Sequence, residues 1–145
     1  MIKREFEAQG VFMWRLPHGA DLFDSLTDFA EKEDITMGTV SAIGAVSEAV
    51  FGFYDQTKKQ YGDIHIDEPL EILSCIGNIS LRDGKPAVHA HIELSYEDGK
   101  TVGGHLMPGT VVFASEATIF KLEGKPLHRG HDDVTGLPLW REDDG

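Results

Sequence analysis

Alternating apolar and polar positions run along most of the chain and predict a protein built mainly from β-strands. Strand-like segments fall at residues 11–16, 39–43, 46–54, 63–67, 70–81, 87–96, 100–106 and 110–122. Turn signals separate them, such as Gly44, Asp98-Gly99 and Met107-Pro108-Gly109. These short connections leave no room for a helix between most strands, which excludes a doubly wound parallel sheet.

One early segment has a helical period and predicts the main helix. Its apolar residues are spaced to form a single stripe: Leu22, Phe23, Leu26, Phe29 and Ala30. Asp24 lies near the start and Lys32 near the end, where their charges complement the helix dipole. One amphipathic helix together with closely spaced strands indicates an α+β fold with a large antiparallel β-sheet.

The length of 145 residues is typical of one domain, so we expect a single domain over residues 1–145. Its core is expected at about residues 8–125. From Glu123 onward the chain turns polar, which indicates a C-terminal arm over residues 123–145 that is ordered as far as Trp140.

The chain is strongly acidic, with 25 Asp and Glu against 13 Lys and Arg and a net charge of −12. Such a charge repels phosphates and disfavours non-specific nucleic-acid binding. The lone Cys75 cannot form an internal disulfide, and the N-terminus carries charges where a signal peptide is apolar. No apolar run reaches the roughly 20 residues of a membrane span. We therefore expect a soluble, cytoplasmic protein without a membrane partner.

The candidate chemistry lies in the strand at residues 87–96. Because side chains alternate along a strand, His89, His91 and Glu93 share one face, while apolar residues such as Ala90 and Ile92 share the other. Two histidines at this spacing project side by side, which is how a β-sheet offers two imidazoles to one metal ion.

A third histidine, His105, joins this pair in one of two possible hairpin registers. A two-residue loop at Asp98-Gly99 would place apolar residues of the second strand on the polar face. A three-residue loop with Gly99 in the left-handed conformation instead pairs Tyr96 with Lys100. His91 then lies opposite His105. The hydrophobic pattern selects this second register, unless a bulge at Gly103-Gly104 shifts the phase.

Three imidazoles converging from two strands indicate a metal site with an open coordination position, with His89, His91 and His105 as ligands. Zinc is the expected metal, although imidazole also suits copper, iron and nickel. The alternative interpretation is a solvated sheet face that happens to carry histidines. Metal-assisted catalysis would need a nearby acid or base, for which the candidates are Glu93, Glu71 and Glu116.

These same segments resemble the PPC domain, the "plants and prokaryotes conserved" family. The resemblance lies in residues 71–80, in Gly84-Lys85-Pro86 with His89-Ala90-His91, in Gly103-Gly104-His105-Leu106, and in Gly109-Thr110-Val111-Val112. It implies an α+β fold with a large antiparallel sheet, a homotrimer, and a metal held by His89, His91 and His105. Plant members join this domain to AT-hook segments, and this chain lacks an Arg-Gly-Arg-Pro hook.

The resemblance leaves three functions open. The first is a metal-binding homotrimer that acts as a binding or regulatory module. The second is a metal-dependent, lyase- or hydrolase-like enzyme on a small polar or acidic substrate, suggested by a more distant resemblance to acetolactate decarboxylase, which binds zinc through three histidines. The third, association with DNA, is disfavoured by the net charge of −12. A positive metal site in an acidic molecule would attract a small anionic ligand.

Overall fold

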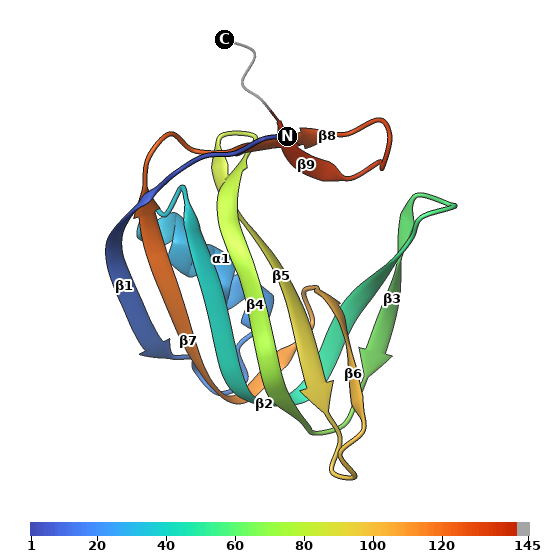
Figure 1. The fold of residues 1–145 in the computed structure, drawn as a ribbon. Helices are drawn as coiled ribbons and strands as arrows, with labels where there is room; N and C mark the ends of the chain where they lie inside the picture. Colours follow the sequence, from blue (N-terminus) through green and yellow to red (C-terminus); the bar gives the residue numbers. More distant parts are fainter. Residues whose placement is uncertain (142–145) are drawn as a thin grey trace.

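The protein is an α+β domain in which one helix packs on a large β-sheet, seen in a computed structural model that describes residues 1–141 (Figure 1). The end of the predicted C-terminal arm, residues 142–145, lies outside the described residues. The one helix of residues 1–141 is neither long nor apolar enough to cross a bilayer. The elements are β1 (Glu7–Arg15), α1 (Leu22–Lys32), β2 (Gly38–Asp55), β3 (Gln60–Ile66), β4 (Leu70–Arg82), β5 (Lys85–Ser95), β6 (Thr101–Leu106), β7 (Val111–Glu123), β8 (His128–His131) and β9 (Pro138–Arg141).

Strand β2 organises the sheet, because its 18 residues pair with four other strands. Its first half lies between β4 and β7, and its second half pairs with β3 and briefly with β6. Because β4 also pairs with β5, and β5 with β6, these pairings form a closed ring of β2, β4, β5 and β6, which includes the two strands that carry the histidines. The two strands predicted at residues 39–43 and 46–54 are therefore one strand, which passes through Gly44 with register shifts rather than ending there.

The hydrophobic core lies between the helix and the inner face of the sheet (Figure 1). Leu22, Leu26 and Ala30 form the buried stripe of α1, which begins at the N-cap Asp21. Every second residue of β5, from Val88 to Leu94, is also buried. The inward face of β5 is therefore apolar, and its histidine face points away from the core.

The C-terminal arm folds back onto one end of the sheet as the hairpin β8–β9. Strand β8 runs parallel to β4, with Arg129 paired to Arg82. The indole Nε1 of Trp140 donates to Ser80 Oγ at 3.1 Å, and the hydroxyl of Tyr54 donates to the carbonyl of Thr135 at 2.7 Å. The arm is thus attached to β4 and to the β2–β3 hairpin, close to the strands that carry the histidines.

Gly77 allows β4 to lie tightly against the strand that carries His89. A Cβ at Gly77 would lie 2.2 Å from the carbonyl oxygen of His89 and 2.6 Å from Cα of Ala90. We expect Gly77→Ala to reduce the free energy of unfolding by about 2–4 kcal/mol, because backbone would have to shift. Urea denaturation measures this. Gly62→Ala is the matched control, since a Cβ there meets nothing within 4 Å; an equal loss in both variants would contradict this account.

Candidate metal centre

The β5–β6 hairpin adopts the register that the hydrophobic pattern selects. Tyr96 donates its N–H to the carbonyl of Lys100 at 2.9 Å, and Gly99 has a φ of 82°. The turn is therefore the predicted three-residue loop, and His91 is paired with His105. Gly103 and Gly104 continue the ladder opposite Glu93 and Ile92 without a bulge.

The register brings three imidazoles together on the outward face of the sheet. One nitrogen of each of His89, His91 and His105 lies within 4.8 Å of the other two. Their ring centroids are 5.0 Å apart for His89 and His105, 5.4 Å for His89 and His91, and 5.6 Å for His91 and His105. His91 is exposed, whereas the other two are half-buried. The cluster is thus open to solvent on one side.

The donor set suits a transition-metal ion. Nitrogen atoms bound to one tetrahedral zinc lie about 3.4 Å apart, a separation that small ring rotations would reach from the observed arrangement. Nδ1 of His105 is buried and has no hydrogen-bond partner. Such a nitrogen is costly to bury unless something binds it. Within residues 1–141, no Asp, Glu or Cys joins this group of potential ligand atoms, so the ligands would be imidazoles only.

The C-terminal arm places an arginine directly beside the cluster. Nη2 of Arg129 lies 3.3 Å from Nδ1 of His89 and donates to Asn78 Oδ1 at 2.7 Å. Asn78 is the residue paired with His89 across β4 and β5. Sequence reasoning missed Arg129, because nothing in the polar arm shows that it folds back onto β4.

An aromatic ring covers another side of the cluster. Tyr61 of β3 lies over His105, with ring centroids 5.0 Å apart and planes tilted by 34°. Tyr54 of β2 packs on Tyr61 at 5.0 Å and is itself tied to the arm through Thr135. The imidazoles thus lie between a tyrosine from the β2–β3 hairpin and an arginine from the arm.

This environment favours neutral imidazoles, the form that binds metal. Burial, with the positive charge of Arg129 as the next contribution, lowers the pKa of His89 to about 4. Burial also lowers the pKa of His105, and the neighbouring His91 contributes in the same direction. Protons therefore compete weakly with a metal for these two nitrogens.

The three candidate carboxylates are not drawn into the cluster. Glu93 follows the histidines on the same face of β5 and is exposed. Glu71 is exposed and pairs with Ser95, beyond Glu93 on that ladder. Glu116 pairs with Ile43 and Arg15, in the part of the sheet made by β1, β7 and β2. The structure therefore places Glu116 away from the strands that carry the histidines. Glu93 is the candidate carboxylate that lies on the same strand as His89 and His91.

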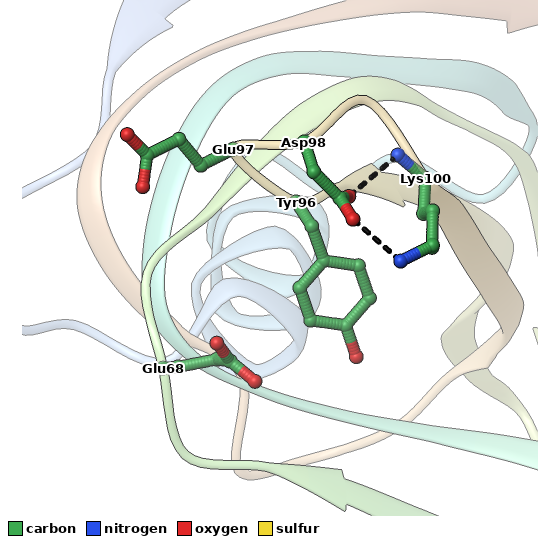
Figure 2. Close-up of a pocket in the computed structure, with 5 residues that line it drawn as sticks. All are labelled: Glu68, Tyr96, Glu97, Asp98 and Lys100. Carbon is green, nitrogen blue, oxygen red and sulfur yellow. Dashed lines mark hydrogen bonds and ion pairs between the residues drawn. The ribbon is translucent and has the colours of Figure 1, made fainter.

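A hollow of the surface lies elsewhere, at the β5–β6 turn. Figure 2 shows its lining residues, of which Tyr96 and Glu68 face each other across it. It measures about 730 Å³ and is wide open. Its one lysine, Lys100, is already paired with Asp98. It contains none of the three histidines, so the candidate site is an open sheet face and not this hollow.

Fold and site together define an α+β domain with a trihistidine cluster. The comparisons identify the family to which this fold belongs. Residues 3–123 match the model of the Plants and Prokaryotes Conserved (PCC) domain. The chain belongs to this family, also written PPC. A metal-containing protein from Archaeoglobus fulgidus is 44% identical, with a TM-score of 0.93 over 98% of this chain and 100% of that one. A plant- and prokaryote-conserved protein from Pyrococcus horikoshii is 34% identical, with a TM-score of 0.92 over 98% of both chains.

Two further similarities are to proteins that are longer than this chain. The bifunctional protein GlmU of two Synechococcus strains is 37% and 36% identical over 87% and 82% of this chain. The matched region spans only 19% and 17% of those curated relatives. Acetolactate decarboxylase from Bacillus subtilis shares the fold at 11% identity, with a TM-score of 0.57 over 90% of this chain and 59% of that one.

The low pKa of His89 predicts that the metal-free protein loses stability in mild acid. The unfolded chain binds a proton at His89 as the pH falls through 6.5, whereas the folded protein does so only near pH 4. The unfolded state thus holds more protons between these values, and stability falls as the pH falls. We expect a loss of about 1 kcal/mol between pH 7 and pH 5, because one pKa unit corresponds to about 1.4 kcal/mol and solvent around the half-exposed ring screens part of the shift.

Urea denaturation of chelator-treated protein at the two pH values measures this loss. His89→Gln should reduce it, whereas His65→Gln, at an exposed position of β3, should retain the wild-type loss. If His89→Gln shows the same dependence on pH as the wild type, the environment described for His89 is wrong.

Proposed function

We propose that this protein is a zinc-binding module in which His89, His91 and His105 hold the metal. The observation that carries the proposal is the convergence of three imidazole nitrogens within 4.8 Å on an outward sheet face. The unpartnered, buried Nδ1 of His105 supports it. The family neighbour from Archaeoglobus fulgidus, which is described as metal-containing, supports it too. Zinc is preferred because neutral imidazoles in a set of three are typical of its sites.

The module is proposed to bind or regulate rather than to turn over a substrate, since no described carboxylate joins the imidazoles as an acid or base. When bound, zinc would supply a Lewis acid with a free coordination position. The exposed position of His91 favours a second candidate, a metal-dependent enzyme acting on a small polar or acidic substrate. A small-molecule activity screen of wild type against His91→Ala separates the two. A charge of −12 argues against DNA as the partner.

The protein is also proposed to be a homotrimer, in which the copies cover an apolar part of the sheet face. Ile76 of β4 pairs with His91 of β5. A row of paired residues runs from there across the sheet, through Ser41 of β2 and a residue of β7, to Met13 of β1. Apolar residues at least 46% exposed cluster around this row: Val11, Met13, Ile43, Ile76 and Phe120. An exposed apolar group of this kind marks an interaction surface. A second copy of the same chain is the natural occupant, as the family resemblance implies three-fold assembly.

Removing one imidazole should abolish stoichiometric metal binding. Wild-type protein loaded with zinc and then dialysed should retain about one zinc ion per chain. His105→Ala should weaken zinc binding by at least about 100-fold, since altering even the outer partners of a ligand costs 10- to 100-fold. Elemental analysis of dialysed samples measures retention, with the exposed His65→Ala as control. Full retention by His105→Ala, or none by the wild type, would contradict the proposal.

A charge in the apolar face should dissociate the assembly. The wild type is expected at about three times the chain mass of 16.0 kDa. Met13→Glu should give the mass of a single chain, because a carboxylate cannot be buried there unpaired. Light scattering after size exclusion measures both. Val134→Glu is the control, because Val134 is 81% exposed in the loop between β8 and β9 and does not belong to this apolar group. A wild-type protein with the mass of one chain would refute the trimer.

A further inference from the structure

Arg129 is a cation fixed in place beside the histidine cluster. Its Nε donates to Ser80 Oγ at 2.9 Å and its Nη1 to the carbonyl of Pro138 at 3.1 Å. The ring of Trp140 lies 5.5 Å from its guanidinium carbon. These contacts come from β4 and β9, and they orient the remaining nitrogen, Nη2, toward His89. The guanidinium is therefore held in advance of any ligand.

Within the part of the chain that the structure describes, residues 1–141, this cation has no carboxylate partner. All four acceptors of its hydrogen bonds are neutral: Ser80 Oγ, Pro138 O, Asn78 Oδ1 and His89 Nδ1. No carboxylate of residues 1–141 forms an ion pair with Arg129. Burial, and after it the like charge of Arg82, lowers the pKa of Arg129. A half-buried guanidinium that no carboxylate of residues 1–141 neutralises is costly unless an anion binds it. It is the arrangement expected where an anion is to be bound.

Arg129 can donate the N–H that now faces His89 to another ligand only when its hydrogen bond to His89 is broken. Arginine can only donate, so Nδ1 of His89 must use its lone pair to accept this bond. A neutral imidazole has one lone pair, and a metal needs the same one. Metal binding at His89 and this hydrogen bond therefore exclude each other. Once His89 serves as a ligand, the Nη2 N–H is left facing the site without its acceptor.

We propose that Arg129 is the anion-recognition residue of this site, and that the loaded site takes a small ligand bearing a carboxylate. The proposal rests on the proposed function and names its ligand class. A metal and a guanidinium side by side leave two positive centres that no described carboxylate neutralises. A carboxylate supplies two oxygen atoms, one for the metal and one to accept from the freed Nη2 N–H.

Calorimetric titration with a matched pair of probes tests this. Glycolate carries a carboxylate, and glycolamide has nearly the same shape without the charge. Zinc-loaded wild type should bind glycolate at least about tenfold more tightly than glycolamide, a ratio typical of one charge-assisted hydrogen bond. Arg129→Met should reduce this preference several-fold, leaving only the part that zinc itself supplies, and should still retain zinc. Arg82→Met is the control, because Arg82 is the neighbour of Arg129 in the β4–β8 pairing and is exposed; it should behave as the wild type.

The outcomes separate this proposal from the one on which it rests. Zinc retained by Arg129→Met with an unchanged glycolate preference would overturn the role of Arg129 alone. Absence of zinc from the wild type would overturn the proposed function and this proposal together. If Arg129→Met fails to fold, Arg129→Lys carries the test. It keeps the charge but cannot make the Nε and Nη1 hydrogen bonds that fix the donor beside His89. Glycolate affinity should therefore fall several-fold, and glycolamide affinity should not change. An unchanged glycolate affinity in Arg129→Lys would overturn the proposal.

Discussion

The pairing register of the β5–β6 hairpin is the constraint on which the candidate site depends. The left-handed Gly99 closes a loop that pairs Tyr96 with Lys100, and every pair beyond it follows from that choice. A slip of one residue would turn the apolar face of one strand outward, which the burial of Leu94 and its neighbours prevents. Core packing on one face of β5 thereby holds His91 opposite His105 on the other.

The C-terminal arm brings a positively charged side chain, Arg129, to the histidine cluster. Strand β8 pairs with β4 at the end of the sheet where His89 lies, and the arm's loop is hydrogen-bonded to Tyr54. One side of the cluster thus faces Arg129 and another faces Tyr61. Neither residue belongs to the strands that carry the imidazoles, so the chemical character of the site depends on the arm and on the β2–β3 hairpin staying docked.

Much of this arrangement follows from local pattern, and the remainder depends on contacts between distant segments. One amphipathic helix among closely spaced strands was enough to predict the α+β class. The alternation along β5 and the Asp98-Gly99 turn were enough to predict the pairing of His91 with His105. The continuity of β2 through Gly44 could not be predicted, because a glycine that ends a strand and one that permits an irregularity look alike in sequence. Arg129 was missed for a similar reason, since only long-range pairing brings the arm to β4.

The central claim is that the three imidazoles hold one metal ion. Anomalous diffraction from zinc-loaded crystals, measured on both sides of the zinc absorption edge, tests it most directly. We expect one strong anomalous peak per chain, about 2.0–2.1 Å from a nitrogen of each of His89, His91 and His105. Zinc bound elsewhere on the chain with no peak among these rings would contradict the account.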